Sequence, residues 1–162
     1  MLYRDMPYWN TSKVTNMSSL FAKIFDEIPD ISNWDVSNVT DMSYMFAFTL
    51  KFKVDISRWN VGNVTNMEWC FSHCSRFNID ISEWNVSNVT NMQSCFSDCT
   101  NFNIDISRWN VSKVINMKWC FSNCISFNQD ISQWNPNNID VPYMFFNCNI
   151  EERFKPSVQI SF

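Results

Sequence analysis

Tryptophan recurs at a constant interval of 25 residues, and this regularity constrains the fold more than any other feature of the chain. The series consists of Trp9, Trp34, Trp59, Trp84, Trp109 and Trp134. A fixed period of this length is typical of proteins built from stacked structural repeats, in which each repeat contacts only its neighbours. Six copies are visible, and the first and last are degenerate, as expected for terminal coils that have a neighbour on one side only.

The copies extend over about residues 5–148, so we expect a single solenoid domain over residues 1–162. The last copy loses one residue around Ile139 to Pro142, and the pattern recovers at Tyr143. The remaining segment, residues 149–162, fits no copy and is expected to form a C-terminal cap or tail.

Two hydrophobic periodicities alternate within each copy. From Phe77 to Ser82 every second residue is apolar, which predicts a short half-buried strand. From Asn63 to Cys74 the apolar residues are three and four apart, which predicts about two helical turns, with a Thr such as Thr65 as the N-cap. The expected fold is therefore an α/β repeat solenoid of about six coils, with a parallel sheet on one side and short helices on the other.

The composition excludes several classes of function. The single glycine, Gly62, rules out the glycine-rich loops that bind dinucleotides and nucleoside triphosphates. The single histidine, His73, rules out zinc and iron sites that need two or more histidines. A net charge of −4 with scattered Lys and Arg provides no electrostatic footprint for nucleic acid, and no apolar run could span a membrane. We expect no catalytic activity, no cofactor and no nucleic-acid partner.

The repeat unit D-I-S-x-W-[ND]-V-S-N-V-T-[ND]-M-x-x-[MC]-F-x-x-C, seen from Asp55 to Cys74 and from Asp80 to Cys99, closely resembles that of BspA-like leucine-rich-repeat surface proteins. That repeat occurs in mycoplasma lipoproteins, in some gut and oral bacteria, in protists and in giant DNA viruses. The resemblance implies a leucine-rich-repeat-like solenoid that serves adhesion or protein binding. Bacterial members carry export signals, and the N-terminus shows none. The chain is in this respect more similar to the giant-virus members, so we expect a cytoplasmic or virion location, with the cell surface as the alternative.

The cysteines form two columns of equivalent repeat positions. Because Met45 and Thr49 occupy these positions in the second copy, we expect the cysteines to be small buried residues of the helix row. Disulfides between neighbouring coils and a four-thiolate zinc site from Cys70, Cys74, Cys95 and Cys99 are the two alternatives. The columns are Cys70, Cys95 and Cys120 in one, and Cys74, Cys99, Cys124 and Cys148 in the other.

Aspartate and tryptophan form two further columns, which we interpret as structural ladders. Identical carboxylates stacked about 5 Å apart repel each other by roughly 1 kcal/mol per pair in water. We therefore expect local backbone N–H groups, Ser hydroxyls or Trp indoles to satisfy them, with cations such as Ca²⁺ as the alternative. The ladder residues are Asp30, Asp55, Asp80, Asp105 and Asp130, with Trp34, Trp59, Trp84, Trp109 and Trp134.

Positions that vary between copies are the candidates for binding a partner. Arg58, Glu83 and Arg108 form a column of alternating charge, which is either a stabilising ladder on the surface or a recognition stripe. A second variable column contains large aromatic residues that the helical wheel places at least partly in solvent, where Trp and Tyr are favoured as binding hot spots. Its aromatic members are Tyr44, Trp69, Trp119 and Tyr143.

The expected function is that of a structural or interaction protein that binds another protein or its own copies, as a component of a giant-virus particle. An adhesin module at a cell surface is the rival hypothesis. A zinc-binding protein that uses the cysteine columns is the third.

Overall fold

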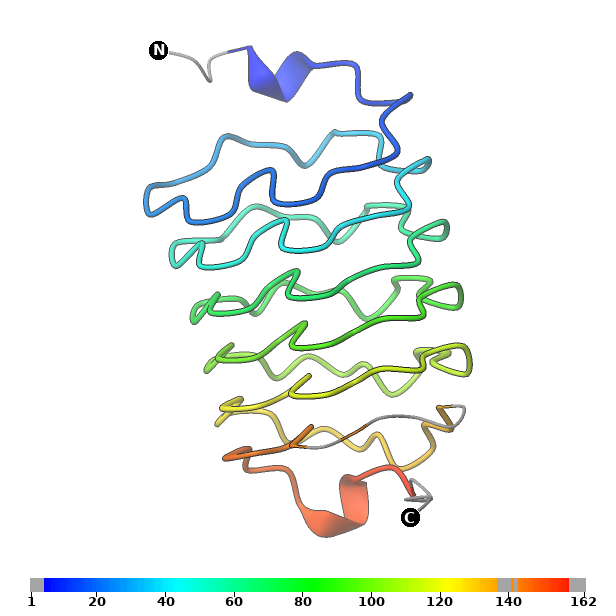
Figure 1. Cartoon of the computed structure of the whole chain (residues 1–162). Coiled ribbons are helices and arrows are strands. Elements are labelled where there is room, and N and C mark those ends of the chain that lie inside the picture. The colour runs from blue at the N-terminus through cyan, green and yellow to red at the C-terminus, as the bar shows by residue number, and fades with distance from the viewer. Residues whose placement is uncertain (1–4, 137–140, 142, 158–162) are drawn as a thin grey trace.

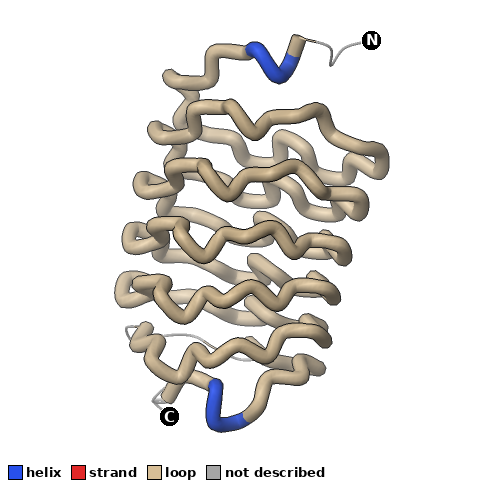
Figure 2. Tube along the Cα trace, turned by 180° about the vertical axis from the view of Figure 1, so that it is seen from behind, coloured by secondary structure: helices blue, strands red, loops and turns tan. Residues whose placement is uncertain are grey.

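The computed structural model describes residues 5–136, 141 and 143–157. The chain winds as a stack of coils that follow one another from the N-terminal to the C-terminal end, so the two ends lie at opposite extremes of the stack (Figure 1). Two short 3-10 helices, η1 (Met6–Tyr8) and η2 (Glu152–Phe154), are the only regular elements in this part of the chain. They lie at the two ends of the stack, and the described residues between them form turns, loops and isolated bridges (Figure 2).

The prediction of an α/β solenoid with a parallel sheet and a row of short helices is wrong. Across the segment from Met67 to Cys74, where the apolar spacing indicates a helix, the backbone instead forms consecutive β-turns. The N–H groups of Cys70, Ser72 and Cys74 donate to the carbonyl three residues earlier, at 2.9–3.1 Å. The intervening N–H groups donate to the next coil, as Trp69 does to Gln93 at 2.8 Å. A helix would use all these donors internally, whereas the turns leave every second one to join neighbouring coils.

These turns require two residues per coil in the left-handed region of backbone conformation. The third coil has them at Trp69 (φ 56°) and His73 (φ 60°), and each neighbouring coil has the equivalent pair. A type II turn places positive φ at its third residue, which is where both residues lie. None of these positions is glycine, so each carries the strain that a Cβ atom creates in this conformation.

The expected strand from Phe77 to Ser82 and the expected Thr N-cap are also wrong. Phe77 and Ile81 are buried, as the alternating pattern indicates, but a ladder of backbone hydrogen bonds does not accompany them. The N–H of Asn103 donates to the side-chain Oδ1 of Asn78 at 3.0 Å, so an amide side chain takes the place of a backbone carbonyl. Among the described residues, parallel pairing is limited to isolated bridges at the repeat position of Asn66. The hydroxyl of Thr65 caps no helix and donates to the carbonyl of Thr40 in the preceding coil.

Stacked aromatic rings fill the interior of the stack. Consecutive rings of the first phenylalanine column lie 5.5–5.8 Å apart, and those of the second lie 5.6–5.8 Å apart. All of these pairs are stacked except Phe52–Phe77, whose rings are tilted by 58°. Both arrangements are favourable beyond the area they bury. The first column is Phe21, Phe46, Phe71, Phe96, Phe121 and Phe145, and the second is Phe52, Phe77, Phe102 and Phe127.

The C-terminal segment packs on the last coil as far as Pro156. The N–H of Ile131 donates to the carbonyl of Phe154 at 3.0 Å, and Pro156 is buried. The predicted one-residue loss around Ile139 to Pro142 falls mainly outside the described residues. The register after it has changed, because the N–H of Asn123 bonds a carbonyl 23 residues later, at Phe146, where the preceding coils bond 24 residues later.

Phe96 tests how far the stack depends on its ring columns. It is fully buried between Phe71 and Phe121, so we expect Phe96→Ala to lower the free energy of unfolding by about 3–5 kcal/mol. Ile115→Ala is the control, because that side chain is 60% exposed and the expected change is within about 0.5 kcal/mol. Urea unfolding followed by tryptophan fluorescence measures both, and equal losses would contradict the packing described.

Lys23 tests the strain at the left-handed positions. Its φ is 61° and its side chain is exposed, so Lys23→Gly removes a Cβ clash at the cost of greater freedom in the unfolded chain. Lys13, which is also exposed, has no positive φ, and Lys13→Gly gains no such relief. We expect the glycine at position 23 to be the more stable variant by about 1–2 kcal/mol in urea unfolding. Equal stability of the two variants would show that the turns are not strained.

Candidate functional site

The left-handed positions form two adjacent columns on one surface of the stack, four residues apart within each coil. The first column contains the aromatic residues that the sequence analysis proposes for partner binding. Tyr44 and Tyr143 are exposed, at 37% and 58%, while Trp69 and Trp119 are half-buried. The two columns are Ser19, Tyr44, Trp69, Ser94, Trp119 and Tyr143, and Lys23, Phe48, His73, Asp98, Asn123 and Asn147.

The aromatic members of the first column stack in pairs. The rings of Tyr44 and Trp69 lie 5.7 Å apart with an interplanar angle of 8°, and those of Trp119 and Tyr143 lie 4.5 Å apart at 18°. Phe146, which is 54% exposed, packs edge-on against Trp119 at 5.8 Å. The structure thus brings the four predicted aromatic residues into one row, which we call the aromatic row together with Phe146.

The aromatic row is interrupted at Ser94, and a pocket of about 450 Å³ lies at the interruption. Its walls include Trp69 on one side and Trp119 on the other, with the buried Ser94 between them. Polar side chains of the same and adjacent coils complete the lining, namely His73, Gln93, Ser97, Asp98, Lys118, Ser122 and Asn123, together with Phe146. The volume is in the range of small-molecule sites.

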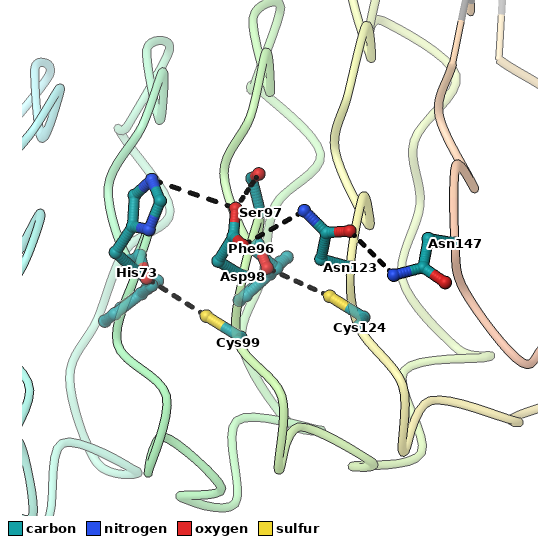
Figure 3. A network of polar contacts seen from close by, with 9 residues as sticks. His73, Phe96, Ser97, Asp98, Cys99, Asn123, Cys124 and Asn147 are labelled. Atoms are coloured by element: carbon teal, nitrogen blue, oxygen red, sulfur yellow. Dashed lines mark hydrogen bonds and ion pairs between the residues drawn. The ribbon is translucent and has the colours of Figure 1, made fainter.

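Asp98 is the centre of a polar network beside the pocket (Figure 3). Its carboxylate accepts hydrogen bonds from the Ser97 hydroxyl at 2.9 Å and from the Asn123 side-chain amide at 3.0 Å. His73 Nε2 lies 3.7 Å from Asp98 Oδ2, and Asn147 donates to Asn123 Oδ1 at 2.9 Å. His73, Asp98, Asn123 and Asn147 all belong to the second left-handed column, so the network runs from coil to coil.

This pocket is not among the sites predicted from the sequence. The predicted residues are the large members of the aromatic column, and Asp98, Asn123 and Lys118 are not among them. The available signal was the interruption itself, because Ser94 occupies a register that is aromatic in the coils on both sides. A serine there removes one ring from a row that supplies one ring in each of the other coils from Tyr44 to Tyr143.

The charged column at Arg58, Glu83 and Arg108 lies apart from the pocket lining. Arg108 Nη1 lies 3.8 Å from Glu83 Oε1, and the two side chains are 85% and 81% exposed. An ion pair this exposed contributes little to stability. Arg58 takes part in no ion pair within the described ranges.

The aspartate ladder is satisfied by local donors. In each of the five coils the carboxylate Oδ1 accepts a hydrogen bond at 3.0 Å from the N–H of the serine two residues later. That serine lowers the pKa of each aspartate through hydrogen bonds from its hydroxyl and its N–H. The hydroxyl has the larger effect on the pKa of Asp30, Asp55, Asp80 and Asp130. The N–H has the larger effect on the pKa of Asp105.

The tryptophan ladder bonds one coil to the next. Each indole Nε1 donates to the backbone carbonyl found 28 residues earlier, at 2.9–3.3 Å, and each of the five indoles is buried. The indole therefore supplies no hydrogen bond to the aspartates, which use the serines.

The cysteine columns point into the core as thiols. The Sγ atoms of Cys74, Cys99 and Cys124 donate to backbone carbonyls of the preceding coil at 2.9–3.0 Å. Thr49 makes the same bond with its hydroxyl at 2.8 Å, so Cys and Thr are interchangeable at this position. Burial raises the pKa of Cys74 to about 12 and that of Cys70 well above its ordinary value. The described residues contain no group of His, Cys, Asp and Glu that could hold a metal ion.

A protein family described as "Mycoplasma protein of unknown function, DUF285" matches the chain over residues 2–103 and 65–155. The chain belongs to this family. In broad terms DUF285 corresponds to the BspA-like repeat that the sequence resembles. Comparison with curated proteins gives no match, and comparison with solved structures also gives none. Within the described part of this DUF285 member, we find no helix of the length and hydrophobicity that a membrane span requires.

The aspartate ladder predicts a loss of stability in acid. The pKa of each ladder aspartate is lower in the folded state than in the unfolded chain, where it is near 3.8, so the ionised carboxyl stabilises the fold. This stabilisation is fully present above the unfolded-state pKa and is lost as the pH falls through the folded-state pKa. The triple variant Asp55→Asn, Asp80→Asn, Asp105→Asn should lose less stability than the parent as the pH falls below about 3.8. Its amides can still accept the turn hydrogen bond, as Asn85 does from Ser87.

Urea unfolding between pH 7 and pH 2 measures this dependence. Asp5→Asn is the matched control, because the Asp5 side chain makes no capping hydrogen bond, and it should leave the acid sensitivity of the parent unchanged. If the triple variant has the same acid sensitivity as the parent, the aspartate ladder is not the cause of that sensitivity.

Proposed function

We propose that this chain is a non-catalytic interaction module that binds another protein, or further copies of itself, through the aromatic row. The observation that carries the proposal is the exposure of three large aromatic side chains on one surface of the stack. Tyr44, Tyr143 and Phe146 are 37%, 58% and 54% exposed. Tyr143 and Phe146 lie together at 6.4 Å, while Tyr44 lies on the other side of the pocket. Exposed aromatic side chains are enriched at protein interfaces, where they form hot spots.

The stacking within the row supports this use. Each exposed tyrosine lies against a half-buried tryptophan, Tyr44 against Trp69 and Tyr143 against Trp119. The rings are therefore held in place before a partner arrives, so binding them costs little side-chain entropy. Rigid aromatic side chains with few rotatable bonds are efficient contact residues for the same reason.

We further propose that the protein works as a component of a giant-virus particle, in line with the composition and the repeat. An adhesin of the BspA-like surface type is the second setting, and it would use the same aromatic row on a cell surface. Mass spectrometry of purified particles and of cell-surface fractions distinguishes them, because the protein would be enriched in only one. The thiol hydrogen bonds and raised pKa values support a structural role for the cysteine columns rather than zinc binding.

The outer members of the aromatic row provide the test. The double variant Tyr143→Ser, Phe146→Ser should reduce self-association or partner binding at least about tenfold, because truncating a hot spot costs about 2 kcal/mol or more. Phe25→Ser together with Ile115→Ser is the matched control, since these side chains are equally exposed, at 63% and 60%, but lie outside the row.

Sedimentation velocity of the purified variants measures self-association, and crosslinking in the native source followed by mass spectrometry measures partner binding. If the row variant and the control behave alike in both measurements, the aromatic row is not the interaction surface.

A further inference from the structure

The two tryptophans that line the pocket belong to the coils on either side of Ser94, and the His73 ring also packs against Trp69, with the ring centroids 6.4 Å apart at 30°. Tyr44 of the preceding coil covers one face of Trp69, and Tyr143 of the following coil covers one face of Trp119. The opposite faces therefore look toward Ser94, the buried residue of the coil between them. The result is a slot with an indole on each side, in the place of one missing ring.

The slot is the space left by one ring of the row. Ser94 lies in the coil between those of Trp69 and Trp119 and has the repeat position that both indoles occupy. In the core, the rings of Phe71, Phe96 and Phe121 in the same three coils lie 5.6–5.7 Å apart, so one six-membered ring at this position would lie between the two indoles.

The rim of the slot is polar and carries both signs of charge. Gln93, Asp98, Lys118 and Asn123 all line it, together with His73. The Asp98 carboxylate already accepts from Ser97 and Asn123, and each of its oxygens has capacity for a further donor. A side chain of purely apolar character would remove water from these groups and give them no partner in return.

We propose that this slot binds a neutral pyranose ring of a carbohydrate. Such a ring has C–H groups on its two faces, which are attracted to the negative faces of indole rings, and hydroxyls around its edge, which can both donate and accept. The faces would lie against Trp69 and Trp119, and the hydroxyls would reach Asp98, Gln93 and Asn123. A neutral ligand suits a rim that contains both Asp98 and Lys118.

The proposal concerns a small ligand between Trp69 and Trp119, whereas the protein-binding proposal concerns the exposed outer rings, of which Phe146 also lines the slot. Its test uses Ser94→Trp, which restores the missing ring and closes the slot. The substitution suits the backbone, since Ser94 has a φ of 52° and the equivalent tryptophans have 56° and 60°. Ser19→Trp is the matched control, because Ser19 occupies the same repeat position with a φ of 58° but lies outside the slot.

The full chain is screened on an array of neutral glycans, and binding of the best mono- or disaccharide is measured by isothermal titration calorimetry. The parent and Ser19→Trp should bind it equally, and Ser94→Trp should bind it at least about tenfold more weakly. If Ser94→Trp does not fold, Trp119→Leu serves instead, since it removes one stacking face and keeps an apolar side chain there.

Three outcomes would overturn the proposal. The first is that no glycan of the array binds the parent. The second is that Ser94→Trp binds as well as the parent. The third is that indole or tryptophan amide binds in the slot while the sugars do not, which would assign the slot to an aromatic side chain of a protein. Phe146 lines the slot and Tyr143 stacks on Trp119, so the Tyr143→Ser, Phe146→Ser variant tests only the protein-binding proposal. Ser94→Trp and Ser19→Trp leave both side chains in place, and sugar binding by these two variants decides the carbohydrate proposal separately.

Discussion

The structure depends on the alternate use of backbone N–H groups, one within a coil and the next between coils. Trp69 donates to the next coil, while Cys70 closes a turn within its own coil. This division joins the coils through the backbone without a sheet and bends each coil without a helix. It also requires the left-handed conformation at two positions per coil, because type II turns have positive φ at the third residue.

The candidate site is a consequence of those left-handed positions. Every member of the aromatic row except Phe146, and every member of the Asp98 network except Ser97, has this conformation. The pocket lies at Ser94 of the first column, beside His73, Asp98 and Asn123 of the second. Strained positions that recur without glycine are more costly than the fold alone needs. A side chain at these positions therefore contributes something that glycine could not, and the stacked rings of Trp119 and Tyr143 show what that contribution is.

The sequence predicted side-chain burial well and backbone conformation badly. Val64, Met67 and Phe71 are buried as the helical spacing indicated, yet their backbone forms turns. Periodicity reports which side chains face the core, and a chain of turns that points every third or fourth residue inward has the same pattern as a helix. The aromatic residues of the row were likewise predicted from their repeat position, whereas the pocket required knowing that Ser94 lies between two facing indoles.

By itself, the sequence determined the 25-residue period, the columns of identical residues and the residues that occupy the core, because identical coils that stack must repeat their buried side chains at one interval. Only the tertiary structure decided how each backbone donor is used, since that choice depends on which carbonyl of the neighbouring coil lies within reach. The tertiary structure also decided where the pocket lies. Trp69 and Trp119 are 50 residues apart in the chain, and only the packing of the coil that contains Ser94 sets the space between them.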